Sequence, residues 1–173
     1  MMFELPDYYP NIDVTDIVWS RYNYVDWNEY KRNYSFHRGG ITLNNGEYFL
    51  FGVDNEYGSL VDIGGGIKRN EDLRYGALRE FREEFNGMIY NLFDNNPDVV
   101  MIKNIFSIIP KVNLNKNKVV KEFKIRRAKA VEKVNCELSD VLWLNRNQIM
   151  NRLREFYGAS RVVAYAIANR YSY

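Results

Sequence analysis

The chain has 173 residues, of which 46% are hydrophobic and 16% aromatic, and its formal net charge is +2. That length suits one well-buried core rather than two, and the apolar fraction excludes a wholly disordered chain. No apolar run approaches the roughly 18 residues of a membrane span, and the first ten residues lack the basic start and apolar centre of a secretory signal, so we expect one cytoplasmic domain over residues 1–173 with no membrane partner.

The beginning of the chain changes character at Tyr34. Residues 1–33 are rich in aromatics without a clean period, which predicts an irregular N-terminal extension. Its rings either pack the extension onto the domain, which we favour, or offer a stacking platform for bases. From Tyr34 onward, two runs of β type, residues 34–43 and 47–53, are joined across Asn45-Gly46, a strong hairpin signal.

The second half of the chain predicts another strand pair and two helices. Residues 99–112 and 119–131 are interpreted as strands around a turn at 113–118. Residues 139–153 are interpreted as a strand followed by a helix that Gly158 would end, and residues 159–173 as a C-terminal helix. A core over residues 34–157 follows, of α/β class.

Between these halves lies the most informative segment, an expected helix from Asp72 to about Asn86. Its apolar residues, among them Ala77, Phe81 and Phe85, fall on one face at 100° per residue. Glu80, Glu83 and Glu84 fall on a neighbouring arc of the same helix.

The three glutamates therefore converge. Like charges three and four residues apart repel, by roughly 0.2 to 0.5 kcal/mol per exposed pair. A hard divalent cation with oxygen ligands removes that cost, and phosphates of a substrate commonly complete its shell. Arg79 lies four residues before Glu83, in reach of a carboxylate that a metal leaves free. The alternative is an ordinary solvated acidic face.

The residues ahead of this helix favour the metal interpretation. Gly64, Gly65 and Gly66 predict a loop that lets backbone approach a ligand, and free N–H groups at a helix start attract anions. Asn70 is a candidate cap, and Glu71 suits the first turn.

The single cysteine and the single histidine do not support a disulfide, a zinc site or a catalytic triad. Cys136 is the only cysteine, which excludes an intrachain disulfide and fits a small core residue. His37 is the only histidine, and no zinc site or Ser-His-Asp triad can be built around it from nearby residues.

The segment resembles the Nudix box, the signature of the Nudix hydrolase superfamily. Seven residues match its spacing in register: Gly65, Glu71, Arg79, Glu80, Phe81, Glu83 and Glu84. The box also has a glycine two residues after the last glutamate, where this chain has Asn86, with Gly87 one place late. Asn tolerates a left-handed helix end, so the helix can still stop there.

This resemblance implies an α/β/α sandwich with a mixed β-sheet between helices. It further implies that Glu80, Glu83 and Glu84 ligate Mg²⁺ or Mn²⁺, with the Gly65 carbonyl as an added ligand, and that Glu71 and Arg79 support them as part of the catalytic set. The carboxylate that activates water belongs either to this cluster or to another loop. The outside candidates are Glu122, Glu132 and Glu137.

Charge is unevenly divided along the chain. Residues 1–100 contain nine Lys/Arg and seventeen Asp/Glu, whereas residues 101–173 contain fifteen and five. Much of the excess lies in the predicted hairpin of residues 111–129, where Lys124, Arg126 and Arg127 are candidate substrate-binding residues. A basic ribbon beside an acidic metal site suits a phosphate-rich substrate. The alternative is a solvated hairpin.

Three functions remain. The first is metal-dependent hydrolysis of a phosphoanhydride in a nucleoside diphosphate linked to another moiety, a small nucleotide or polyphosphate being the partner. The second narrows the substrate to the 5′ cap or 5′ end of RNA, as in mRNA decapping, or to a dinucleoside or inositol polyphosphate. The third is a non-catalytic nucleotide- or RNA-binding module. The abundance of Asn, Lys and Tyr is typical of AT-rich genomes, including viral ones, and oligomeric state stays open.

Overall fold

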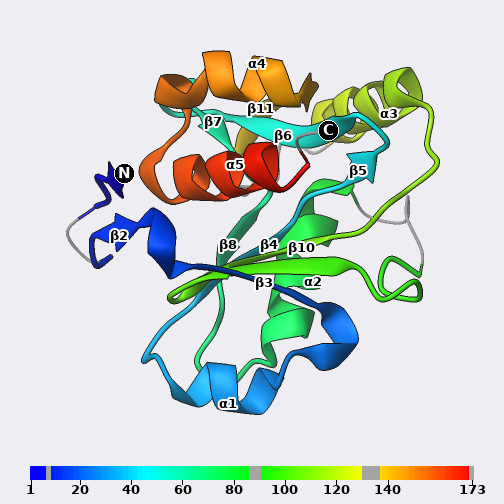
Figure 1. Ribbon diagram of the computed structural model, residues 1–173. Helices are drawn as coiled ribbons and strands as arrows, with labels where there is room; N and C mark the ends of the chain where they lie inside the picture. Colours follow the sequence, from blue (N-terminus) through cyan, green and yellow to red (C-terminus); the bar gives the residue numbers. More distant parts are fainter. Residues whose placement is uncertain (7–8, 86–90, 130–136, 172–173) are drawn as a thin grey trace.

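The computed structural model describes residues 1–6, 9–85, 91–129 and 137–171 of the chain (Figure 1). Two β-sheets lie at its centre. One has five strands in the order β3-β9-β10-β4-β8, in which only β10 and β4 run parallel. Their bounds are β3 Ile17–Arg21, β4 Arg38–Ile41, β8 Gly64–Gly66, β9 Asp98–Ile102 and β10 Ile105–Ile109.

The second sheet has the order β11-β6-β5, with β7 paired to the other end of β6. Its strands are β5 Asn44–Asn45, β6 Tyr48–Asp54, β7 Leu60–Val61 and β11 Leu138–Asn145. β5 and β6 form the predicted Asn-Gly hairpin, in which Gly46 has a φ of 71°. A short ladder of β1 (Met2–Phe3) and β2 (Ile12–Asp13) lies apart from both sheets.

The helices cover both sides of the sheets. They are α1 Trp27–Arg32, α2 Leu73–Phe85, α3 Lys116–Lys129, α4 Arg146–Asn151 and α5 Gly158–Arg170, with short 3-10 turns at Val14–Asp16, Tyr22–Tyr24 and Leu153–Glu155. Figure 1 shows α5 and α2 on opposite sides of the five-stranded sheet.

Alternating side chains of the strands explain this layering. In β9, Val100 packs into the cluster around α5, whereas its neighbour Val99 packs into the cluster around α1, α2 and α3. In β10, Ile105 and Phe106 divide in the same way. Because successive strand residues point to opposite faces, both faces are buried and both need helices. The predicted α/β/α sandwich is confirmed, with two sheets in place of one.

The predicted strand at 119–131 is wrong in its described part, because residues 116–129 form α3. Val119 and Phe123, four residues apart, are its buried residues, and Ile125 is 40% exposed. Phe123 and Ile125, which a strand would place on one face, therefore do not share a buried face. The pair that does form is β9 and β10, which turns at Lys103, with a φ of 54°.

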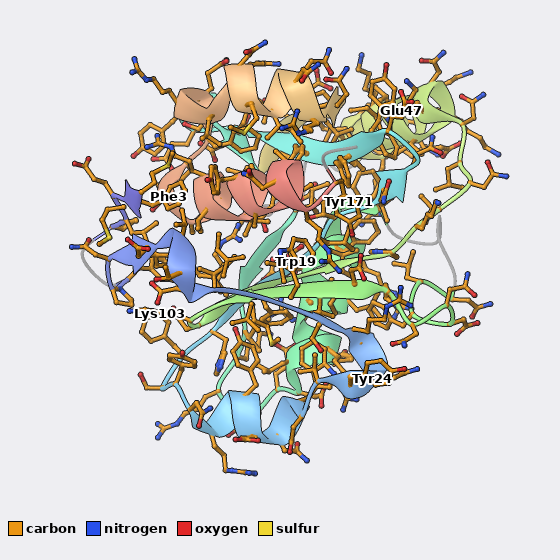
Figure 2. All side chains as sticks on the ribbon, in the orientation of Figure 1. Phe3, Trp19, Tyr24, Glu47, Lys103 and Tyr171 are labelled. Atoms are coloured by element: carbon orange, nitrogen blue, oxygen red, sulfur yellow. The ribbon has the colours of Figure 1, made fainter. Side chains whose placement is uncertain are left out.

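The N-terminal extension is more regular than predicted. β3 adds a fifth strand to the central sheet through β9. Trp19 of β3 meets the ring of Tyr171 edge to face at 5.9 Å, and Figure 2 shows the two side chains together. Trp27 and Tyr30 of α1 are buried. Packing of these rings onto the domain explains the aromatic content, although Tyr24 stays 76% exposed.

Two smaller expectations also change. Gly158 does not end the helix that follows β11, because α4 stops at Asn151 and Gly158 is the first residue of α5. Within the described ranges, none of the helices combines the length and apolarity that crossing a bilayer requires.

Candidate functional site

The three glycines ahead of α2 form a strand, β8, and not the predicted loop. β8 pairs with β4, and a side chain on Gly64 would lie 2.5 Å from the carbonyl oxygen of Gly39. A Cβ on Gly65 would lie 2.6 Å from the carboxyl carbon of Glu80, whereas a Cβ on Gly66 would meet nothing within 4 Å. Gly65 therefore leaves the space that the Glu80 carboxylate occupies.

The described part of helix α2, Leu73–Phe85, begins within one residue of the predicted start. Its cap is Asp72 and not Asn70, since Asp72 Oδ1 accepts hydrogen bonds from the backbone N–H groups of Arg74 (2.9 Å) and Tyr75 (3.2 Å). Two of the helix's initial N–H groups are thus already satisfied. The predicted stop at Asn86 and Gly87 lies outside the described residues.

Arg79 is the centre of a network of carboxylates. Its Nε and Nη2 donate to the two oxygens of Glu71 at 2.7 and 3.0 Å, and its Nη1 donates to Glu80 (3.0 Å) and Glu83 (3.1 Å). Nη2 also reaches the carbonyl oxygen of Gly66 at 3.2 Å. The hydrogen bonds from Arg79 hold the pKa of Glu71 below its usual range. One guanidinium therefore links the loop before α2 to two glutamates on the helix.

Glu80 and Glu84 line a small cavity of about 90 Å³, whose wall also includes Glu137, the residue before β11. Only 7% of Glu84 is exposed. Burial, and then repulsion from Glu137, raise the pKa of Glu84 to about 7, against which Arg126 acts in the opposite direction. Burial and the neighbouring Glu83 likewise raise the pKa of Glu80. Burial and the neighbouring carboxylates thus keep both pKa values raised, although Arg79 pairs with Glu80 and Arg126 acts on Glu84.

The side chains of this cavity have the chemistry that a hard divalent cation requires. Among the described residues, no three His, Cys, Asp or Glu side chains converge closely enough to form a ready-made metal cluster. The cavity nevertheless joins carboxylate oxygens, the ligands of Mg²⁺ and Mn²⁺, and their raised pKa values mark a place where added positive charge is favourable.

Three charged residues of this cavity, Arg38, Asp54 and Asp62, escaped the sequence analysis. Arg38 and Asp62 also line it, and they form an ion pair of 2.8 Å. In the sequence, Arg38 directly precedes Gly39-Gly40 in a predicted strand, and Asp62 lies within residues 58–66. Nothing in the sequence indicates that these two charges meet.

The three candidates for the base outside the glutamate cluster differ in their position relative to the cavity. Glu137 lies in the cavity wall. Glu122 lies on the exposed surface of α3, and Glu132 lies outside the described residues, as does Cys136.

The three basic candidates all belong to α3. Arg126 Nη2 donates to the carbonyl oxygens of Glu83 (2.9 Å) and Arg82 (3.4 Å) near the end of α2. Arg127 donates to the carbonyl oxygen of Leu138 and to the side chain of Asn55. Lys124 is exposed. Two of the three predicted substrate contacts thus also connect α3 to its neighbours, and only Lys124 points into solvent without such a bond among the described residues.

Comparison with known proteins identifies the fold. No protein-family model matches the chain, and no curated protein is similar to it in sequence. Among solved structures it is similar to a bifunctional NMN adenylyltransferase/ADP ribose pyrophosphatase from Francisella tularensis, with a TM-score of 0.54 and 12% identity over 82% of this chain. The complex of that protein with AMP and a manganese ion gives a TM-score of 0.54 and 11% identity over 83% of this chain.

The chain spans only 45% and 46% of the length of those two structures. A hydrolase of the Nudix family from Clostridium perfringens has a TM-score of 0.47 and 12% identity, with 80% of this chain and 99% of that one covered. The fold of this chain is therefore similar to that of the two structures from Francisella tularensis.

Proposed function

We propose that this protein is a metal-dependent hydrolase that cleaves a phosphoanhydride bond in a nucleoside diphosphate linked to another moiety. The single observation that carries this proposal is that buried Glu84 and partly buried Glu80 line one cavity, and that the pKa of each is raised although Arg79 pairs with Glu80 and Arg126 acts on Glu84. Repulsion between carboxylates costs stability unless a cation or proton offsets it, and such arrangements are typical of functional sites.

The proposed roles follow the geometry. Glu80, Glu83 and Glu84 would hold Mg²⁺ or Mn²⁺, with the Gly65 carbonyl as an added ligand. When bound, the metal would neutralise phosphate charge and lower the pKa of a bound water. Arg79 fixes the orientations of Glu80 and Glu83 through its hydrogen bonds, and Glu71 holds Arg79 in place.

Glu137 is the strongest candidate for the base outside α2. It lies in the cavity wall and its charge acts on both Glu80 and Glu84. Glu137 directly precedes β11 and lines the cavity without belonging to the helix. In hydrolysis, the oxygen of water would bond to one phosphorus as the P–O bond to the bridging oxygen breaks, and Glu137 would accept the proton that the water loses.

The substrate class is supported by the similar structure from Francisella tularensis, which is named for an ADP ribose pyrophosphatase and was solved with AMP and manganese. ADP-ribose is a nucleoside diphosphate linked to another moiety. Since that protein is bifunctional and more than twice as long as the matched part, its activity supports the choice of substrates to test first and no more.

A cap or the 5′ end of RNA is a second candidate substrate. It is favoured by the basic residues of α3, among which Arg126 contacts the backbone near the end of α2. Dinucleoside and inositol polyphosphates present comparable charge. A third candidate, a non-catalytic binding module, is disfavoured because every acidic position of the box is occupied.

Hydrolysis of a mixed panel in ¹⁸O-labelled water tests these alternatives together. The panel contains nucleoside triphosphates, ADP-ribose, NADH, dinucleoside polyphosphates, diphosphoinositols and capped RNA, each with Mg²⁺ or Mn²⁺, and products are resolved by mass. We expect one ¹⁸O atom in one phosphorylated product, whose identity gives the attacked phosphorus. No turnover on any substrate with either metal would contradict hydrolysis and favour the binding module.

A further inference from the structure

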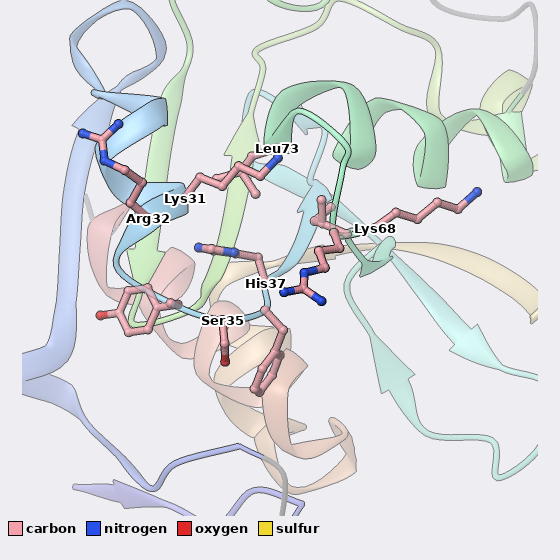
Figure 3. A pocket seen from close by; sticks show the side chains of 10 residues that line it. Lys31, Arg32, Ser35, His37, Lys68 and Leu73 are labelled. Atoms are coloured by element: carbon pink, nitrogen blue, oxygen red, sulfur yellow. The ribbon is translucent and has the colours of Figure 1, made fainter.

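A second and larger cavity lies between the segment that follows α1 and the loop that leads into α2 (Figure 3). Its volume is about 590 Å³, within the range of roughly 300 to 1,000 Å³ that is common for small-molecule sites. Four of its ten lining residues are basic and none carries a carboxylate. The basic residues are Lys31, Arg32, Lys68 and Arg69.

This concentration of positive charge is unusual for its place in the chain. Residues 1–100 contain only nine Lys/Arg against seventeen Asp/Glu, yet four of those nine line one cavity. Arg32, Lys68 and Arg69 are exposed, and among the described residues they form no ion pair. Because these three cations line one cavity whose lining residues include no carboxylate, an anion is favourable here.

Lys31 has a different role. Its Nζ donates to the carbonyl oxygen of Glu71 at 2.6 Å, which joins the end of α1 to the loop before α2. The same Glu71 binds Arg79 with its carboxylate. The cavity is therefore built on a loop that is held from both sides, and the backbone that carries Lys68 and Arg69 is fixed by these bonds.

Two aromatic rings complete the wall. Tyr34 is 38% exposed and Phe36 is 43% exposed. Tyr34 meets the rings of Tyr30 and His37 edge to face, and Phe36 meets that of Tyr9 at 5.7 Å. Since these contacts leave part of each ring in solvent, the rings can receive a flat partner, as bases do on aromatic side chains.

We propose that this cavity binds a nucleotide, with its phosphates held by Arg32, Lys68 and Arg69 and its base against Tyr34 or Phe36. Arginine and lysine are the usual partners of phosphate oxygens, and stacking accounts for the rings that a site for inorganic phosphate would not need. Binding here uses no residue of the acidic cavity. The site would therefore bind its ligand whether or not the protein hydrolyses phosphoanhydrides.

The experiment is calorimetric titration with ATP, tripolyphosphate and adenosine in the presence of EDTA, which removes any contribution from a bound metal. Arg32→Glu and Arg69→Glu are compared with Lys121→Glu, an exposed lysine of α3 that undergoes the same change of charge. We expect each pocket variant to weaken ATP by about tenfold or more, the usual effect of losing a bond to a charged group, and the control by about twofold or less.

Tyr34→Ala and Phe36→Ala separate the base from the phosphates. At least one of them should weaken ATP while leaving tripolyphosphate unchanged, and adenosine alone should bind more weakly than ATP. Thermal melts of all variants, together with the milder Arg69→Gln, distinguish lost contacts from lost folding.

Three results would overturn the proposal: no ATP binding in EDTA, the same loss in Lys121→Glu as in the pocket variants, or undiminished ATP binding in both ring variants. Glu83→Gln should retain ATP binding in EDTA. If it does so while the substrate panel gives no turnover, the proposed hydrolysis fails and the nucleotide site stands.

Discussion

Arg38 and Asp62 form an ion pair that is almost entirely removed from water. Nη1 of Arg38 lies 2.8 Å from Oδ1 of Asp62, whose side chain has no exposed surface, while that of Arg38 is 11% exposed. Ser160 of α5 donates its hydroxyl to the same carboxylate at 2.6 Å and accepts the backbone N–H of Asp62. The pair thus connects α5 to the floor of the acidic cavity.

Breaking this pair from one side should be costly. In Asp62→Asn, Arg38 keeps its buried charge without a partner, so we expect the free energy of unfolding to fall by about 3 to 5 kcal/mol. Ser160→Ala removes only a hydrogen bond and should cost about 1 to 2 kcal/mol. Urea denaturation measures both. An equal loss of unfolding free energy in the two variants would mean that the ion pair stabilises the fold no more than a single hydrogen bond does.

The space above Gly65 gives a matched pair of variants. Gly65→Ala places a methyl group 2.6 Å from the carboxyl carbon of Glu80, whereas Gly66→Ala meets nothing within 4 Å. If Glu80 is a metal ligand, kcat/KM should fall by about tenfold or more in the first variant and by less than about twofold in the second, since small misplacements of catalytic groups are costly. Similar activities in both would show that the position of Glu80 is unimportant for turnover.

The helix glutamates are tested by isosteric neutralisation. Glu83→Gln and Glu84→Gln should each reduce kcat on whichever substrate the panel identifies by orders of magnitude, because each removes a charged oxygen ligand. Glu47→Gln, at the exposed hairpin turn, is the control. Circular dichroism should show intact folds, and the Gln variants should be no less stable than the wild type without metal. Wild-type turnover in both would end their assignment as ligands.

The metal-free protein should lose stability as pH rises from 4.5 to 7. Glu84 has its pKa raised from 4.5 to about 7 in the folded state, so in this window the folded protein binds a proton that the unfolded chain has lost. Below 4.5 both states are protonated, and above about 7 the loss is complete. Its size is on the order of 1 to 3 kcal/mol.

Glu84→Gln should lack this component, so the difference in Tm between variant and wild type should grow across the window in EDTA. Added Mg²⁺ at pH 8 should raise the Tm of the wild type more than that of the variant, since ligand binding to the folded state stabilises it. Parallel Tm curves for the two proteins would refute the raised pKa of Glu84.

Substitutions of the basic residues of α3 should have effects that depend on whether the residue makes hydrogen bonds. Arg126→Gln removes hydrogen bonds to carbonyls near the end of α2 and should lower the free energy of unfolding by about 0.5 to 1.5 kcal/mol, whereas Lys124→Gln should leave it unchanged. Lys124→Glu should raise KM for polyphosphate-rich substrates more than for small ones. Equal changes in KM for both substrate classes would exclude a selective contact at Lys124.

The sequence predicted most accurately where one local period decided the structure. The start of helix α2 could be placed to within one residue, and its apolar face at Ala77, Phe81 and Phe85 repeats at helical spacing and is in fact buried. The hairpin at Gly46 depended on an equally local preference for positive φ. In both cases residues close together in the sequence were enough to predict the local structure.

Long-range packing accounts for the errors. Helix α3 was mistaken for a strand because its buried face consists of only Val119 and Phe123 among many charges, and what covers them is α2 and β11, distant in sequence. The same holds for Arg38 and Asp62, which are 24 residues apart and meet only through strand pairing. β8 likewise becomes a strand because β4 approaches glycines that have no side chains to prevent it.

Strand β3 has a practical consequence for anyone who shortens this protein. A fragment that begins at residue 34 would lack the partner that β3 supplies from Ile17 to Arg21, so β9 would expose a ladder of free amides and carbonyls from Asp98 to Ile102. Unprotected strand edges recruit other chains. Truncations meant to stay soluble should therefore retain residues 17–21, which pair with β9.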